Sequence, residues 1–316
     1  MSILNKQITS SYTRKIFMIS SISLLIFLGF QALSYIIGLN ETTTFLLVAV
    51  VLYLYMVFKL TFIFDLNLKK ARAWEESVKH YKAFDTIPLR NTRIILRAIK
   101  LRFHYLTHWS NWRHFQNYLI LPGFLYWSII ILFFLNPFDL IAKQIFVVVG
   151  TLLLTVILWH FKMVFITYGK ASIILRYLLF ASTILTSFLI FSGILGLKWY
   201  FGISDMNFIT AIFASAFLLF YQSLFHRDKV NLKNLFFVLL GVALVALGGY
   251  FITLYWRVNF YSAGALLAGV AYTYWGIFLL HLTKRLTFRQ VMEHAWVMAF
   301  VLLYVLATTN FSARIG

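Results

Sequence analysis

The residues most able to do chemistry are histidines that recur at helical spacing in a basic stretch. His104 and His108 are one helical turn apart, with His114 further along, and two histidines at this spacing can share a metal ion. No carboxylate lies nearby, and the chain lacks the paired HH and HxxHH boxes that membrane fatty-acid desaturases and hydroxylases use. We therefore interpret these histidines as interfacial side chains and predict neither a metal nor a cofactor.

A second group of ionisable residues lies in or beside long apolar stretches. Its members are His160, Lys162, His226, His281, Glu293 and His294. Ionisable residues in membrane spans are costly and often mark a functional site, so this group is a candidate intramembrane polar cluster. A structural role is the alternative, because Glu293 has Arg289 at i−4 as an ion-pair partner and Lys162 can extend its amine towards water.

The residues and motifs that several kinds of reaction or transport require are absent from this sequence. No acidic residue lies near the middle of an apolar stretch, which disfavours transport coupled to protons or sodium. Walker A, HExxH and GxSxG motifs are absent, as are paired aspartates for magnesium-diphosphate chemistry. Cysteine is absent too, which excludes disulfides and thiolate sites. The sequence therefore disfavours an enzymatic function.

The elements that would position these residues are membrane helices. Hydrophobic residues make up 62% of the 316 residues and charged residues 12%, about half the charged fraction of a soluble protein. Spans of about 20 residues must be helical, because lipid offers backbone groups no partners. We predict an all-α polytopic transmembrane bundle of about nine spans. The predicted spans are Ile16–Leu39, Thr42–Phe64, Asn117–Leu135, Gln144–Tyr168, Ile173–Leu197, Phe208–Phe225, Leu235–Leu254, Ala263–Leu282 and Val291–Ala307.

The polar stretch 65–116 divides the chain into three parts. Residues 1–64 are predicted to form an N-terminal tail and a first transmembrane hairpin, and residues 117–316 a seven-span bundle. The stretch between them carries eleven Lys/Arg against four Asp/Glu. At about 100° per residue, its second half has a basic stripe beside a broad apolar face. The stripe consists of Arg93, Arg97, Lys100, His104 and His108, and the apolar face of Ile94, Ala98, Leu101, Tyr105, Trp109 and Trp112.

A basic amphipathic helix of this kind suits the membrane interface, with anionic lipids of the cytoplasmic leaflet as partners. The stripe is thus a candidate binding site for lipid head groups. A docking surface for a nucleotide or an acidic partner protein is the alternative. No nucleic-acid-binding motif accompanies the charge, so we predict no nucleic-acid partner.

The distribution of basic residues predicts the orientation. Placing the N-terminus in the cytoplasm leaves only Lys143, Lys198, Arg257 and Arg314, of 28 basic residues, on the far side. Because Lys and Arg collect in cytoplasmic loops, we predict an N-in, C-out protein of a bacterial cytoplasmic membrane or its equivalent.

The last third of the chain is rich in small residues. The runs LLGVALVALGGYFI (239–252) and SAGALLAGVAYTYWG (262–276), followed by Lys284-Arg285, resemble part of a repeat of drug/metabolite transporters of the EamA-like kind. The resemblance implies a helical transporter, and it carries no site residue across.

Three functions remain open at this point. The first is a permease-like or lipid-handling protein whose basic helix faces anionic head groups. The second is a non-catalytic membrane component that docks a partner through residues 65–116. The third is an integral-membrane enzyme that acts on lipid head groups through the cytoplasmic-side histidines. We favour the first, because nine spans exceed what an anchor requires.

Overall fold

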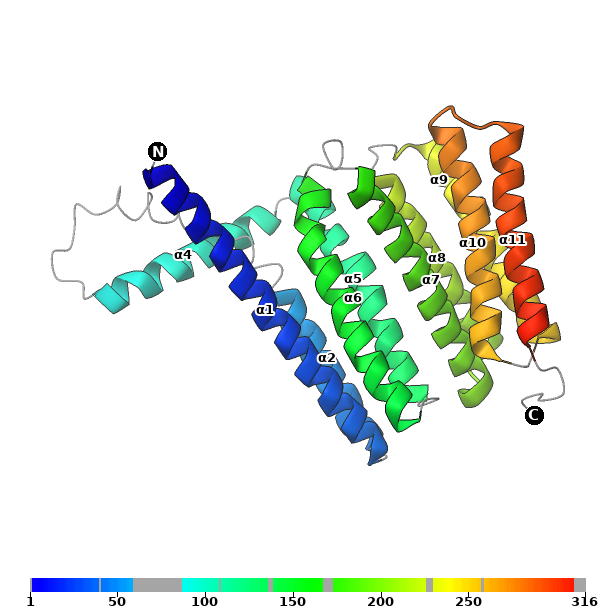
Figure 1. Cartoon of the computed structure of the whole chain (residues 1–316), viewed down its shortest axis with the longest axis horizontal. Coiled ribbons are helices and arrows are strands. Elements are labelled where there is room, and N and C mark those ends of the chain that lie inside the picture. The colour runs from blue at the N-terminus through cyan, green and yellow to red at the C-terminus, as the bar shows by residue number, and fades with distance from the viewer. Residues whose placement is uncertain are drawn as a thin grey trace. The chain divides into compact units, whose positions relative to one another are not determined.

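A computed structural model describes residues 2–39, 41–58, 87–107, 109–135, 139–166, 173–225, 230–256 and 259–309. Every regular element in these ranges is an α-helix (Figure 1). The helices are α1 (Ser2–Gly38), α2 (Thr42–Phe58), α4 (Ile87–Thr107), α5 (Trp109–Leu135), α6 (Leu140–Ile166), α7 (Ile173–Phe201), α8 (Asp205–Phe225), α9 (Leu232–Tyr255), α10 (Phe260–Leu282) and α11 (Phe288–Thr308). The prediction of an all-α fold is confirmed for the described residues.

Seven of these helices, α1 and α6 to α11, contain stretches long and apolar enough to cross a membrane. Two shorter apolar helical stretches lie in α2 and at Ile120–Leu135 of α5. The 17 residues of α2 extend about 26 Å at 1.5 Å per residue, close to the hydrocarbon thickness of about 30 Å. The chain is therefore an integral membrane protein, and the seven long helices coincide with predicted spans.

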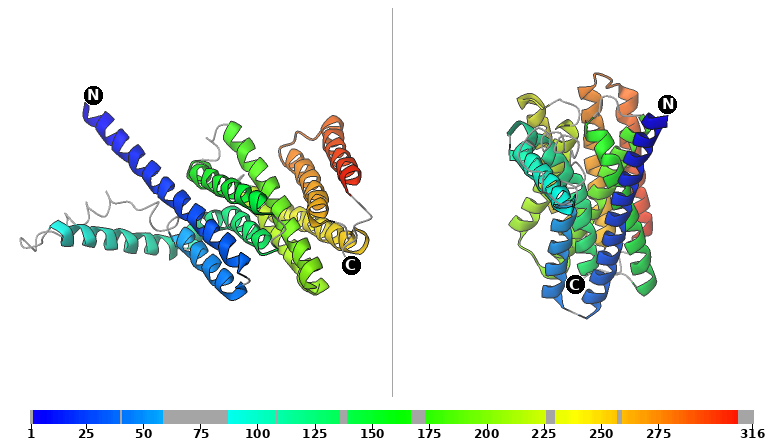
Figure 2. Two further views of the ribbon diagram at one scale, coloured as in Figure 1. Left: turned by 60° about the horizontal axis from the view of Figure 1, so that its bottom comes forward. Right: turned by 90° about the vertical axis from the view of Figure 1, so that its left-hand side faces the viewer.

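The chain divides into two compact units, Met1–Ile36 with Glu41–Leu119 and Ile37–Asn40 with Ile120–Gly316. In the first unit, α1 and α2 form a hairpin in which Gly29 lies directly against the side chain of Leu52. The axis of α4 runs at a steep angle to this hairpin (Figures 1 and 2). When the hairpin spans the membrane, α4 therefore runs across that direction rather than along it.

The second unit is organised around α10. Helices α7, α9 and α11 all pack on α10, while α8 packs on α7 and α9, and α6 on α7. Of the apolar stretch in α10, 61% is buried, against 6% in α11. Helix α10 is thus the centre of this bundle, and α11 lies at its periphery with one side on α10.

Polar residues cap the N-termini of five helices. Each accepts a hydrogen bond from a backbone N–H in the first turn of its helix, which satisfies a donor that the helix leaves unpaired. These capping residues are Asp139 for α6, Ser204 for α8, Asn231 for α9, Asn259 for α10 and Thr287 for α11.

Hydroxyl groups inside the spans mostly bond to their own helix. Thr151 donates to the carbonyl of Val147 at 2.8 Å, and Ser187 donates to the carbonyl of Thr183 at 2.8 Å. Such bonds satisfy a hydroxyl in a medium without water. Because their hydroxyl groups already have hydrogen-bond partners, we do not count these side chains among the candidate site residues.

Candidate functional site

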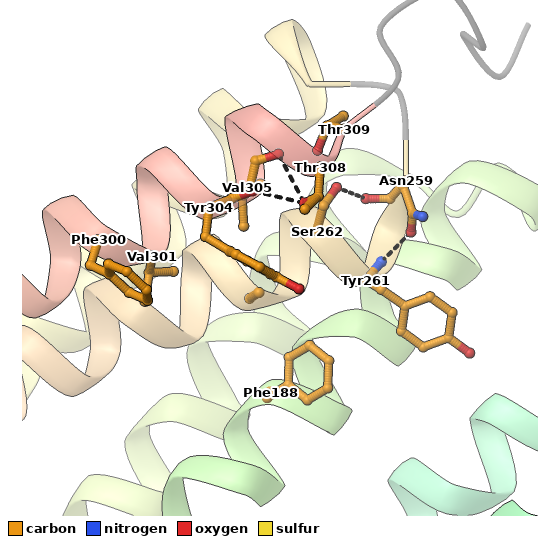
Figure 3. A pocket seen from close by; sticks show the side chains of 11 residues that line it. Phe188, Asn259, Tyr261, Ser262, Phe300, Val301, Tyr304, Val305, Thr308 and Thr309 are labelled. Carbon is orange, nitrogen blue, oxygen red and sulfur yellow. Dashed lines mark hydrogen bonds between the residues drawn. The ribbon is translucent and has the colours of Figure 1, made fainter.

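A cleft opens between α7, α10 and α11, where α10 begins and α11 ends (Figure 3). Helix α10 forms its floor, because both α7 and α11 pack on α10. Its volume is about 570 Å³, within the roughly 300–1,000 Å³ of small-molecule sites. The lining consists of Phe188 from α7, of Asn259, Tyr261, Ser262 and Ala265 at the start of α10, and of Phe300, Val301, Tyr304, Val305, Thr308 and Thr309 at the end of α11.

Small residues on α10 hold the two walls close to the floor. A Cβ built on Gly264 would lie 2.8 Å from both Cα and N of Ser192, so the backbones of α10 and α7 nearly touch there. On the other side, a Cβ on Gly269 would lie 2.9 Å from Sδ of Met298 on α11. Small positions of this kind allow close helix packing in membranes. The cleft is therefore flanked by tightly packed contacts on each wall.

The mouth of the cleft is polar. Asn259 caps α10 by accepting a hydrogen bond from Tyr261 N–H at 2.8 Å, and the Ser262 hydroxyl donates to the Asn259 carbonyl at 2.8 Å. On the opposite wall, the Thr308 hydroxyl donates to the Tyr304 carbonyl at 2.8 Å. Thr309 Oγ1 is buried and has no hydrogen-bond partner among the described residues. Unsatisfied buried hydroxyls of this kind are uncommon in folded proteins.

The deeper part of the cleft is apolar. Phe188 lies in the middle of α7, and Phe300 and Val301 lie near the middle of α11. Tyr304 reaches from α11 across the cleft towards Phe188 (Figure 3). None of the described lining residues is charged. The cleft therefore changes from polar at the helix ends to apolar at depth, which suits an uncharged amphipathic molecule.

Three side chains of the basic stripe are described on α4, those of Arg97, Lys100 and His104, and they lie on a different side of the helix from Ile94 and Ala98. Lys100 and His104 are exposed, and Arg97 is half-buried. Arg93 belongs to α4, although its side chain is outside the described part, and His108 lies outside the described residues. The described members of the stripe thus lie on one helix.

The apolar side of α4 differs from the expectation. Ile94 and Ala98 were expected to form the face turned to the membrane, but both are buried in the protein, with Leu101 packed against them. Instead, Ile95 and Leu96 are exposed. A periodic pattern defines the faces of a helix but not which neighbour covers each face.

Only part of the predicted intramembrane cluster is described with side chains. His281 lies in the last turn of α10, and Glu293 and His294 lie in the second turn of α11, so adjacent helices carry all three. The backbones of His160 and Lys162 lie in α6, but their side chains are outside the described part, as is His226 altogether. Glu293 forms the predicted ion pair with Arg289, with Oε1 3.2 Å from Nε, and both side chains are exposed.

The two described histidines of this cluster pack against different neighbours. The ring of His294 lies directly on Gly276 and stacks on Tyr272 with centroids 5.4 Å apart. Its Nδ1 is 2.9 Å from the Gln290 carbonyl, to which it can donate a hydrogen bond. The ring of His281 lies 6.0 Å from that of Phe237 on α9. The ring of His294 is thus packed between α10 and α11, whereas His281 is exposed at the end of α10. No group of three metal-binding side chains occurs among the described residues.

The cleft was not predicted from the sequence. Asn259 and Ser262 are polar residues beside a short loop, a pattern shared by several other helix ends in this chain. Val301 and Phe300 resemble any lipid-facing residues. The small residues of α10 were the one sequence feature related to the cleft. They indicated close helix packing, but they did not indicate which helices pack on α10.

Comparison with curated proteins and with solved structures gives no match. Residues 94–308 match the family described as "Protein of unknown function (DUF5656)". This match begins on the buried face of α4 and ends at the last residue of α11, so it contains every residue of the cleft except Thr309. The chain, itself an integral membrane protein, belongs to this family of unknown function.

Proposed function

We propose that this protein handles a membrane lipid, and that it takes an uncharged amphipathic molecule from the bilayer into the cleft between α7, α10 and α11. One observation carries the proposal: polar groups gather at the mouth of the cleft and apolar side chains line its depth. A lipid has the same polarity gradient from its polar end to its chains. The amide of Asn259 would bind hydroxyl or ester groups, while Phe188 and Val301 would contact a chain.

A polar solute fits this cleft less well. A path for such a solute needs polar groups at mid-membrane depth, where unpaired polar atoms are costly. Here the residues nearest the helix centres, Phe188, Phe300 and Val301, are apolar. Among the described residues, His281 and His294 do not form a metal site with a third ligand, so the enzyme alternative has less support here than lipid handling. Lipid handling is therefore the better supported part of the first hypothesis.

In this proposal the two shorter apolar helices also cross the membrane, which makes nine spans with the N-terminus in the cytoplasm. Helix α10 then begins, and α11 ends, on the far side of a bacterial cytoplasmic membrane. The mouth of the cleft faces that side, and the apolar part extends towards the bilayer centre. Lys and Arg usually collect on the cytoplasmic side of a membrane protein. Among the described residues, Lys143 and Lys198 are the main basic residues that lie on the far side in this orientation.

A photo-crosslinking experiment tests the proposal with a diacylglycerol that carries a diazirine in one acyl chain. The full-length protein in lipid nanodiscs is irradiated with this probe, and modified peptides are identified by mass spectrometry. We expect modification to concentrate at residues 300–305 of α11. Ala265→Phe should reduce it at least several-fold, because the new ring fills the floor of the cleft.

The matched control is Ala214→Phe, which places the same side chain at an exposed position of α8 that does not line the cleft. This variant should keep the crosslinking pattern of the unmodified protein. Modification spread evenly along the exposed side of α11, and unchanged by Ala265→Phe, would reject the cleft as a lipid site.

A further inference from the structure

Helix α4 presents three distinct faces rather than two. One face is buried in the protein, with Ile94 6% and Ala98 3% exposed. A second face is apolar but exposed, with Ile95 47%, Leu96 60% and Phe103 58% exposed. At about 100° per residue, Arg97, Lys100 and His104 occupy a third sector between these two.

The exposed apolar face cannot belong to a membrane span. The 21 residues of α4 include Arg90, Arg93, Arg97, Lys100 and Arg102, and α4 is not among the helices apolar enough to cross. Yet large apolar side chains that gather on one exposed face usually mark a surface that another phase or molecule covers. The combination of many charges and an exposed apolar face is typical of a helix that lies in the membrane interface.

Three further features indicate which surface covers α4. In Figure 1 its axis crosses the direction of the α1–α2 hairpin, so α4 runs along a membrane that the hairpin crosses. A single residue separates α4 from α5, whose Ile120–Leu135 is apolar. The surrounding stretch 65–116 has eleven basic residues against four acidic ones, which complements anionic head groups.

We propose that α4 lies in the head-group layer of an anionic leaflet, inserts Leu96 and Phe103 among the acyl chains, and binds lipid phosphates through Arg97 and Lys100. The buried face meanwhile keeps α4 attached to the protein. This interaction surface is independent of the cleft, since it uses none of the cleft residues. Its occupant is the bilayer itself, and an acidic partner protein is the competing occupant.

The lack of native cysteine makes a direct test possible. Single variants Leu96→Cys and Phe103→Cys are spin-labelled and placed in nanodiscs of phosphatidylcholine, alone or mixed with phosphatidylglycerol. Power-saturation EPR then compares label accessibility to oxygen, which enters the acyl region, and to a nickel chelate, which stays in water. We expect both labels to be accessible to oxygen and protected from nickel in the anionic nanodiscs.

Two controls make the result specific. Leu286→Cys introduces the same change in the exposed loop between α10 and α11, and its label should remain accessible to nickel. Adding Arg97→Glu and Lys100→Glu to Leu96→Cys should raise nickel accessibility several-fold in anionic nanodiscs and change it little in neutral ones.

Two outcomes would overturn the proposal. If the labels at Leu96 and Phe103 are as accessible to nickel as the label at Leu286 in both lipids, α4 does not insert. If protection is the same with and without phosphatidylglycerol, and the charge reversals leave it unchanged, binding of anionic head groups is wrong. Protection that arises only when a protein from the cell membrane is retained would assign the surface to a partner protein instead.

Discussion

Gly264 of α10 lies directly on Ser192 of α7, where a Cβ would come within 2.8 Å of the Ser192 backbone. The Ser192 hydroxyl is buried at this contact and has no hydrogen-bond partner among the described residues. The contact joins the floor of the cleft to one of its walls. Since backbone atoms cannot move aside as a flexible side chain can, this contact leaves no room for a larger residue.

We therefore expect Gly264→Ala to lower the thermal stability of the protein, by about 1–3 kcal/mol of unfolding free energy for an overpacked contact. Gly248→Ala is the matched control on α9, because a Cβ there meets only Leu267 Cδ1 at an ordinary 3.5 Å. The control should be neutral or slightly stabilising, since alanine is the better helix former by about 1 kcal/mol. Unfolding in detergent followed by tryptophan fluorescence checks both, and equal melting temperatures would contradict the packing argument.

A second prediction concerns the hydrogen bond between α10 and α9. The Tyr274 hydroxyl donates to the Phe237 carbonyl at 2.6 Å, and its ring fills the space beside Gly241. Tyr274→Phe should therefore cost about 0.5–1.5 kcal/mol of unfolding free energy. Tyr272→Phe removes a hydroxyl that has no hydrogen bond among the described residues, and it should change stability less. Chemical denaturation of the two variants distinguishes them, and an equal loss would show that the bond contributes little.

A third prediction separates the histidines that the sequence grouped together. His294→Ala removes a ring that packs on Gly276 and Tyr272, so we expect a loss of about 1–3 kcal/mol, typical of a half-buried side chain. His281 is exposed, and His281→Ala should stay within about 0.5 kcal/mol of the unmodified protein. A chelator should not change either melting temperature. If zinc raised the melting temperature of the unmodified protein but not that of either variant, a shared metal site would replace the packing role.

A fourth prediction tests orientation and span number with single cysteines in four loops or helix ends. A membrane-impermeant maleimide should label Glu41→Cys and Met206→Cys in intact cells. It should label Val230→Cys and Leu286→Cys only after the membrane is permeabilised. This pattern follows from nine spans with the N-terminus inside. Labelling of Glu41→Cys and Met206→Cys from opposite sides would mean that one of the two shorter helices does not cross.

The sequence by itself determined the class of protein and the positions of its membrane helices. Seven predicted spans coincide with helices long and apolar enough to cross a membrane, and the other two overlap shorter apolar helical stretches, because an apolar stretch in lipid must satisfy its own backbone hydrogen bonds. Helix α4 begins at Ile87, one residue before Pro88. Pro88 is tolerated there, since a proline in the first turn removes an N–H that would have no intrahelical partner.

Only the tertiary structure decided which faces are covered and where a cleft remains. The pattern of α4 predicted one apolar face, and the fold buries Ile94 of that face while it leaves Leu96, on another side of the helix, exposed. Likewise, Phe188 and Val301 lie more than a hundred residues apart, and they line one cleft because α7 and α11 both pack on α10. Periodicity defines directions around a single helix axis, whereas a cleft depends on how three helices pack. That arrangement depends on close contacts such as the one between Gly264 and Ser192, which no local pattern contains.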